Sequence, residues 1–99
     1  MTMMHSYLYT EYAEEMDFLG KNLIGLTDAT KAEVKTLIPV LRDDSEMEWC
    51  SGPVLKLQTY NTGEIADEVH EFLNATQGTS KLIRILFKKG RVIELSIKW

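Results

Sequence analysis

The last nineteen residues of the chain, 81–99, constrain the fold most, because they predict two β-strands joined by a tight turn. Apolar residues alternate along both segments: Ile83, Ile85 and Phe87, then Ile93, Leu95, Ile97 and Trp99. A three-residue loop at 88–90, with Gly90 in the left-handed position, would keep these residues on one face. This loop would pair apolar residues with each other, Ile85 with Ile93 and Ile83 with Leu95. It would also pair opposite charges, Arg84 with Glu94. We therefore expect an antiparallel hairpin in this register.

Helical patterns dominate the first half of the chain. Residues from about 6 to 19 have apolar side chains at helical spacing and predict a helix, although the alternation over residues 3–9 also fits a strand. A second helix is expected to begin near 28–30, because Thr30 and Glu33 have capping-box spacing. Its apolar stripe is Val34, Leu37, Ile38 and Leu41. Pro39 lies inside that stripe, so the helix should kink or end near Leu37.

The middle of the chain predicts another hairpin and another helix. Segments 46–50 and 54–60 can pair through a Ser51-Gly52-Pro53 loop, which sets Trp49 opposite Leu55 and Glu48 opposite Lys56. Residues from about 63 to 76 place apolar side chains on one side of a helix and acidic ones on the other. The apolar set is Ile65, Val69, Phe72 and Leu73, and the acidic set is Glu64, Asp67, Glu68 and Glu71.

These elements predict a single α+β domain over residues 1–99. The expected architecture is a four-stranded, mainly antiparallel sheet of two hairpins packed against two to three helices, in the order α-α-β-β-α-β-β. Helices should cover one face of this sheet, which is lined by Met47, Trp49, Leu55, Leu57, Ile83, Ile85, Ile93, Leu95 and Ile97.

The amino-acid composition indicates the cellular location to expect. The chain has one cysteine, Cys50, so it cannot form an intrachain disulfide, and a reducing, cytoplasmic location is the expectation. Residues 1–5 lack the basic start and apolar run of a signal peptide. No stretch approaches about 18 consecutive apolar residues, so no membrane span is predicted.

Residues with catalytic or metal-binding chemistry are sparse. Asp67, His70 and Glu71 would share a helix face and could hold a metal, but an exposed histidine on an acidic surface is the favoured interpretation. Cys50 would need His70 beside it to act as a nucleophile, and no nucleophile signature surrounds it. Phosphate-binding and paired-histidine motifs are absent. We expect no catalytic residues, no cofactor and no metal, and thus no enzyme.

Charge is unevenly distributed along the chain. Residues 1–78 contain 14 acidic and 5 basic residues, whereas residues 79–99 contain 1 acidic and 6 basic residues. Acids occupy the first helix at Glu11, Glu14, Glu15 and Asp17. The candidate partner-binding residues are Glu64, Asp67, Glu68, Glu71, Asp43 and Asp44. The alternative site, for nucleic acid, is the basic tip formed by Lys88, Lys89 and Arg91.

The favoured hypothesis from these patterns is a small acidic binding protein. Its acids would cover a basic protein partner, such as the nucleic-acid-binding surface of another protein. Toxin-immunity proteins and phage-encoded inhibitors of defence complexes have this size and charge, an analogy of composition only. The alternative is a regulatory or nucleic-acid-binding module that uses the basic hairpin. Direct nucleic-acid binding is disfavoured, because the net charge is −4.

Overall fold

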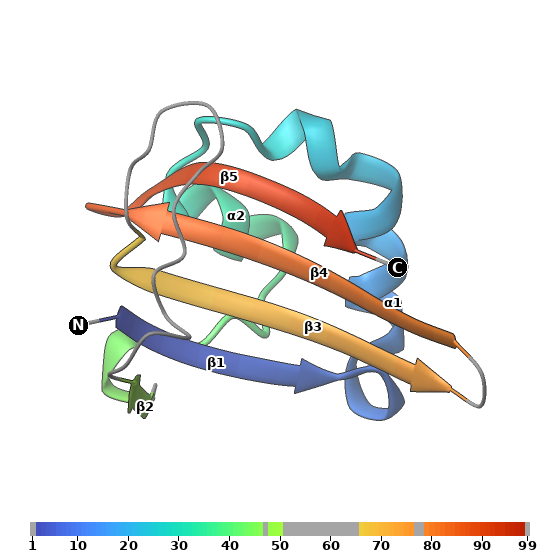
Figure 1. Ribbon diagram of the computed structural model, residues 1–99. Coiled ribbons are helices and arrows are strands. Elements are labelled where there is room, and N and C mark those ends of the chain that lie inside the picture. The colour runs from blue at the N-terminus through green and yellow to red at the C-terminus, as the bar shows by residue number, and fades with distance from the viewer. Residues whose placement is uncertain (1, 47, 51–65, 77–78, 99) are drawn as a thin grey trace.

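The computed structural model describes residues 2–46, 48–50, 66–76 and 79–98, which form one mixed sheet with helices on one face. Figure 1 shows the sheet, whose strands lie in the order β2-β1-β3-β4-β5. The four longer strands are β1 (Thr2–Leu8), β3 (Glu68–Thr76), β4 (Thr79–Lys88) and β5 (Arg91–Lys98). The short β2 (Glu48–Cys50) pairs with β1 at the edge. The α+β class is confirmed.

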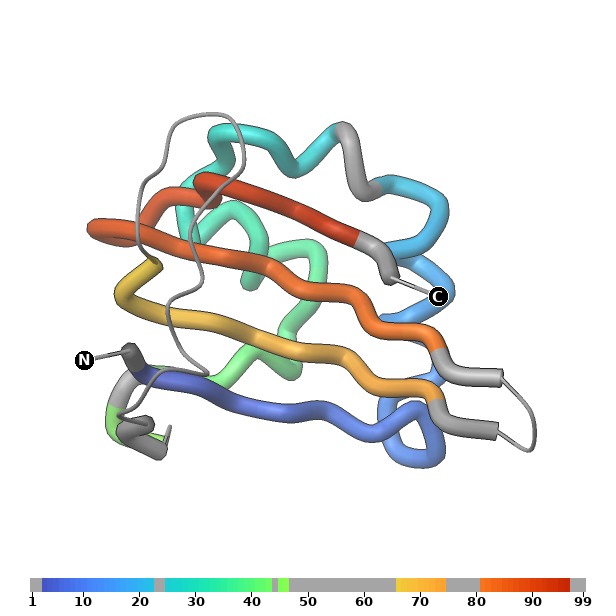
Figure 2. Tube along the Cα trace, in the orientation of Figure 1, coloured from blue at the N-terminus to red at the C-terminus, as the bar shows by residue number. Residues whose placement is uncertain are grey.

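The sheet is mixed rather than mainly antiparallel, because β1 runs parallel to β3. The other neighbouring strands are antiparallel. A parallel pair needs a long crossover connection. That connection includes α1 (Tyr9–Asn22), the 3-10 helix η1 (Leu23–Leu26), α2 (Lys31–Leu37) and the 3-10 turn η2 (Asp44–Glu46). Figure 2 shows that the helices all lie behind the same face of the sheet.

The N-terminal segment is a strand followed by a helix. The expected helix over residues 6–19 is wrong for its first three residues, and the alternative strand over residues 3–9 is right as far as Leu8. The alternation of side chains along the strand explains this result: Tyr7 is buried in the core beneath the helices and Met3 on the same face is also buried, whereas Ser6 and Leu8 are exposed on the other face. The helical part then begins at Tyr9, and Met16 and Leu19 bury its inner side.

The second helix is as predicted. Thr30 is its N-cap, and its hydroxyl accepts a hydrogen bond from the Glu33 backbone N–H at 3.2 Å. α2 ends at Leu37, two residues before Pro39. Of the predicted apolar stripe, Val34, Ile38 and Leu41 are buried, but Leu37 is 51% exposed.

The C-terminal hairpin forms, but its predicted register is wrong. Ile85 lies opposite Leu95, and Arg84 lies opposite Ser96. The turn has two central residues, Lys89 and Gly90, whose φ angles of 51° and 74° fit the positive values that a type I′ turn requires. A β-bulge next to this turn shifts the register: Leu86 lies opposite Glu94 and Phe87 opposite Val92, which leaves Ile93 of β5 as the extra residue. Leu95 therefore lies on the helix-covered face as expected, whereas Val92 takes the place on that face that was expected for Ile93.

The third predicted helix, over residues 63–76, is wrong where the structure describes it. Residues 68–76 form β3, the central strand between β1 and β4. This strand buries residues on both of its faces, so its apolar residues need not alternate strictly with polar ones. Val69 and Phe72 are both fully buried, on opposite faces. The predicted 46–50/54–60 hairpin is described only through β2, and residues 54–60 lie outside the described part.

The main core lies between the helices and the sheet. It contains Tyr7, Met16, Leu19, Leu26, Val34, Ile38, Leu41, Phe72, Ile83, Ile85, Phe87 and Val92. The predicted core residues Ile83, Ile85 and Phe72 are confirmed, and Leu95 is partly buried against this core. Ile93 was expected on the same face but packs instead with Val69 and Leu86 on the opposite face, because the bulge intervenes. The side chains of Met47, Trp49, Leu55, Leu57 and Ile97 lie outside the described part.

Candidate functional site

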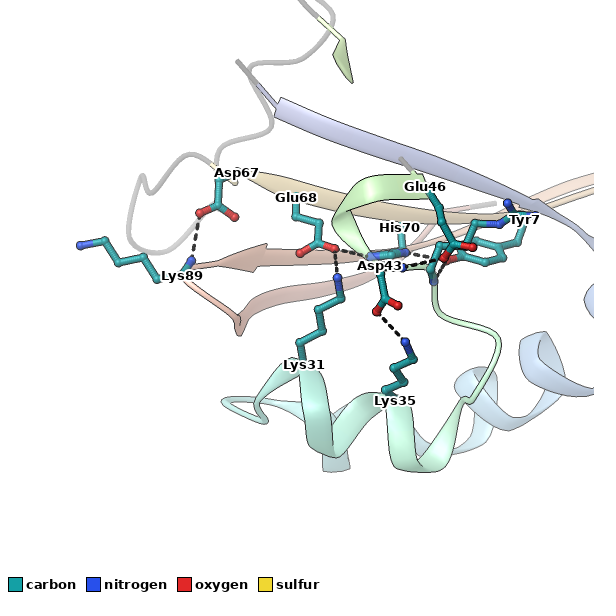
Figure 3. Close-up of polar contacts among 10 residues, drawn as sticks. Tyr7, Lys31, Lys35, Asp43, Glu46, Asp67, Glu68, His70 and Lys89 are labelled. Atoms are coloured by element: carbon teal, nitrogen blue, oxygen red, sulfur yellow. Dashed lines mark hydrogen bonds and ion pairs between the residues drawn. The ribbon is translucent and has the colours of Figure 1, made fainter. Parts of the chain in front are cut away.

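A chain of polar side chains crosses the main core between α2 and the sheet (Figure 3). We call it the buried network; its members are Lys31 on α2, Glu68 and His70 on β3, and Tyr7 on β1. His70 and Tyr7 have no exposed surface, and Glu68 is 6% exposed. Polar groups buried to this degree need hydrogen-bond partners.

Each member of the buried network meets the next at hydrogen-bond distance. Lys31 Nζ lies 2.5 Å from Glu68 Oε1, and His70 Nε2 lies 2.9 Å from the same oxygen. The Tyr7 hydroxyl lies 2.7 Å from His70 Nδ1 and accepts a hydrogen bond from the Arg42 backbone N–H at 2.9 Å. Two residues apart on one strand, Glu68 and His70 point to the same face.

These partners allow one consistent set of hydrogen-bond directions. The Tyr7 oxygen accepts from the Arg42 N–H, so its own proton is free to be donated to His70 Nδ1. The imidazole proton then resides on Nε2 and is donated to Glu68. This arrangement gives the hydroxyl, the imidazole, the carboxylate and the ammonium a hydrogen-bond partner each.

The pKa values agree with this assignment. Burial raises the pKa of Tyr7 well above its ordinary value, so the hydroxyl keeps its proton. Burial would also raise the pKa of Glu68, but the hydrogen bonds from His70 and Lys31 outweigh it and lower the pKa below 4.5. The carboxylate of Glu68 is therefore ionised at neutral pH.

The buried network ties elements together rather than presenting a reactive group. A substrate would have to reach an imidazole and a phenol that have no exposed surface. Lys31, whose side chain is 18% exposed, is the member nearest to solvent. The backbone N–H of Lys31 also donates to the Gly90 carbonyl oxygen at 2.8 Å, so the start of α2 is fixed to both β3 and the β4–β5 turn.

The expectation that His70 lies exposed on an acidic helix is wrong. His70 shares a face with Glu68, whereas Glu71 points to the opposite face and pairs with Arg84 at 2.8 Å. The trio Asp67, His70 and Glu71 is therefore divided between faces, and no group of three potential metal ligands occurs within the described ranges. Cys50 ends β2, and its side chain lies outside the described part.

The predicted partner-binding acids do not form one surface. Glu68 and Glu71 are buried and ion-paired, so the expectation that they are exposed is wrong. Asp67 is exposed, and its carboxylate accepts from the Lys89 backbone N–H at 3.0 Å. Asp43 is exposed and pairs with Lys35 at 2.6 Å, and this ion pair lowers the pKa of Asp43. Glu64 and the Asp44 side chain lie outside the described part.

The basic hairpin tip is close to acidic and carbonyl groups. Lys89 and Arg91 are exposed, and Lys88 is partly exposed. The Arg91 guanidinium donates to the Asp28 carbonyl oxygen at 3.1 Å. The tip thus fixes the position of the segment before α2 as well as carrying positive charge.

The largest set of exposed acids among the described residues lies on α1. Glu11, Glu14 and Asp17 are exposed, and Glu15 is partly exposed. None of the four forms an ion pair with another residue of the described ranges, unlike Glu68, Glu71 and Asp43. These acids are evident in the sequence. The candidate site was nevertheless assigned mainly to residues 63–76, because that segment was predicted to be an acidic helix.

No protein-family model, curated protein or solved structure matches this chain. In the described part of the chain, no helix has both the length and the apolar character needed to cross a membrane.

Proposed function

We propose that the chain is a small non-catalytic binding protein of the cytoplasm that covers a basic surface of a protein partner. The contact surface is the exposed acidic side of α1, formed by Glu11, Glu14, Glu15 and Asp17. Such a protein acts as an inhibitor when the covered surface is one that its partner uses to bind nucleic acid.

The observation that carries this proposal is the difference between paired and unpaired acids. The buried acids Glu68 and Glu71 have their charges balanced within the fold by Lys31 and Arg84. The acids of α1 have no such partner among the described residues. Their charge therefore acts on approaching molecules, where it accelerates association with a basic surface and weakens as salt is added.

The competing function is nucleic-acid binding by the hairpin tip, Lys88–Arg91. Two exposed bases favour it. The Asp67 carboxylate, hydrogen-bonded to the Lys89 backbone, places a negative charge at the same tip and would repel phosphates. We therefore rank this function second.

The two functions are separated by two charge-reversal variants. One carries Glu11→Lys, Glu14→Lys and Asp17→Lys, and the other carries Lys88→Glu, Lys89→Glu and Arg91→Glu. After a pull-down has identified the partner, association rates are measured at two salt concentrations, with circular dichroism as the control for folding. We expect the α1 variant to associate at least about tenfold more slowly and with less salt dependence. Normal association of this variant, or a larger loss in the hairpin variant, contradicts the proposal.

A further inference from the structure

We propose that His70 is a pH-sensitive switch that controls how firmly the segment after α2, residues 38–46, is held against the sheet. An imidazole with one ring proton accepts a hydrogen bond from the Tyr7 hydroxyl, whose oxygen accepts in turn from the Arg42 backbone N–H. A second ring proton would remove the first of these contacts and weaken the second. The inference does not depend on the proposed function, because it concerns the response of the fold to pH.

Tyr7 is the polar link between His70 and the segment 38–46. Its hydroxyl oxygen lies 2.7 Å from His70 Nδ1 and 2.9 Å from the Arg42 nitrogen. The ring of Tyr7 stacks on Phe72, with centroids 4.3 Å apart, and has no exposed surface. Figure 3 shows His70 between Glu68 and Tyr7. The tyrosine is therefore fixed in a position from which its hydroxyl reaches both partners.

A second ring proton on His70 does not fit this arrangement. Histidine is the side chain whose charge ordinarily changes between pH 5 and 8, and both nitrogens of the charged ring are donors. The Nδ1–H and the Tyr7 O–H would then point at each other. Tyr7 does not resolve the conflict by losing its proton, because burial raises the pKa of its hydroxyl. If the hydroxyl turns and accepts from Nδ1, its own proton loses its acceptor in a buried site, which is unfavourable.

The same change weakens the hold on Arg42. A hydroxyl that donates one hydrogen bond is a better acceptor for another, because hydrogen bonds in a chain polarise one another. When Nδ1 becomes a donor, the Tyr7 oxygen no longer benefits from donating and must accept from two N–H groups at once. The bond from the Arg42 N–H is therefore expected to lengthen or break.

The charged groups on the other side of the ring do not remove the conflict. Glu68 accepts from His70 Nε2, and Lys31 of α2 binds the same carboxylate oxygen. Nε2 remains a donor in both charge states of the ring, so these contacts persist. Attraction to Glu68 favours a positive charge on the imidazole, and Lys31 opposes it. Both residues influence how readily the ring gains its proton, but neither contacts Nδ1.

The remaining neighbours come from β1, β4, α1 and the segment itself. They are His5 and Tyr7 of β1, Ile85 and Phe87 of β4, Tyr12 of α1, and Arg42, whose guanidinium hydrogen-bonds to Tyr12. His5 lies opposite His70 in the β1–β3 ladder, and its ring centroid is 4.4 Å from that of Tyr7. Because it is a second titratable histidine beside the same tyrosine, His5 provides the matched control.

The segment that responds to this switch carries charge. Asp43 and Glu46 are exposed, whereas Leu41 is 2% exposed and belongs to the main core. Leu41 keeps the segment attached when the Arg42 bond is lost, so the change is local. Acid would therefore alter how Asp43 and Glu46 are presented at the surface without unfolding the sheet.

The test follows amide hydrogen exchange of Arg42 by NMR between pH 7.5 and pH 5, corrected for the intrinsic exchange rate at each pH. The Ile38 amide, which donates to the Val34 carbonyl oxygen at 2.8 Å, is the reference. We expect the protection of Arg42 to fall about tenfold relative to that of Ile38 as the pH is lowered. Nitrogen-15 spectra of the imidazole should show a proton on His70 Nδ1 over the same pH range.

Two variants distinguish the histidines. His70→Asn keeps an acceptor near the position of Nδ1 but cannot gain a proton, so the protection of Arg42 should stay constant within about twofold. His5→Asn should retain the fall of about tenfold seen in the wild-type protein. Loss of the pH dependence in His5→Asn, or its persistence in His70→Asn, overturns the proposal.

The wild-type protein decides the matter if His70→Asn does not fold. Three results contradict the switch: a proton on Nδ1 without a change at Arg42, a change at Arg42 at a higher pH than the protonation, and an imidazole that keeps a single ring proton down to pH 5. None of them affects the proposed function, because the acids of α1 are not members of the buried network.

Discussion

The acidic residues on the two faces of β3 differ in their partners. On the face toward the helices, Glu68 bonds to both Lys31 and His70, and His70 bonds in turn to Tyr7. On the other face, Glu71 has one ion pair, with Arg84 on the next strand. The first carboxylate connects elements that are distant in sequence, whereas the second connects neighbouring strands of a hairpin. The same residue type thus fixes the tertiary structure on one face and supports local pairing on the other.

The largest expected effect on stability comes from truncating a buried side chain on the helix-covered face of the sheet. Phe72 is fully buried and stacks on Tyr7, with ring centroids 4.3 Å apart. We expect Phe72→Ala to lower the free energy of unfolding by about 3–5 kcal/mol, because it leaves a cavity beside the buried network. Leu73→Ala, one residue away on the partly exposed face, should cost markedly less. Equal losses in urea titrations would show that the two faces are packed to the same degree.

The next largest effect on stability is expected from neutralising one carboxylate on each face of β3. Glu68→Gln should lower the free energy of unfolding at pH 7 by about 1–3 kcal/mol, because buried hydrogen bonds of Lys31 and His70 are weakened. The matched variant Glu71→Gln should cost about 1 kcal/mol or less, since the Arg84 side chain is 23% exposed and can be solvated. Urea titrations of both variants measure the difference, and a greater loss in Glu71→Gln would reverse the comparison.

Glu68 should also make the free energy of unfolding depend on pH. The pKa of Glu68 is lowered on folding, so its contribution to stability is complete above about pH 4.5, the ordinary value, and disappears as the pH falls through the folded-state pKa. Unfolding free energies of the wild-type protein and Glu68→Gln should therefore converge as the pH falls below 4.5. Parallel curves between pH 7 and pH 3 would show that Glu68 does not contribute to acid sensitivity.

The smallest effect is expected at the surface. Asp43 is exposed, and its ion pair with Lys35 lies in water. Exposed ion pairs contribute little, because solvent screens the charges. Asp43→Asn should leave the urea midpoint unchanged within error. A clear shift in the midpoint would mean that the loop after α2 is held by this pair.

Local patterns were sufficient for part of the fold. The cap at Thr30 and the end of α2 before Pro39 were predicted because neighbouring residues determine both. Alternation predicted the faces of Ile83, Ile85 and Leu95 in the C-terminal hairpin, but the register and the face of Ile93 were wrong, because the bulge is an insertion that reverses the alternation beyond it. The turn type depends on a positive φ at Lys89, which the sequence pattern does not indicate.

Distant contacts were not predictable in the same way. The acids of β3 suggested a solvated helix face because their partners, Lys31 and Arg84, lie elsewhere in the sequence. No spacing rule connects Tyr7 with His70, which are 63 positions apart. The buried network was therefore missed, although burial of a histidine beside a paired carboxylate would have followed at once from the correct strand assignment.

The parallel pairing of β1 with β3 has a consequence for how the chain folds. Antiparallel strands β3, β4 and β5 follow one another and can associate as soon as they are made. β1 is synthesised first, yet its ladder partner begins at Glu68. Contacts of such long sequence separation form slowly, because a large loop must close. We expect the three-stranded C-terminal meander to gain protection first in pulsed hydrogen exchange, and the N-terminal strand to be the last to enter the sheet.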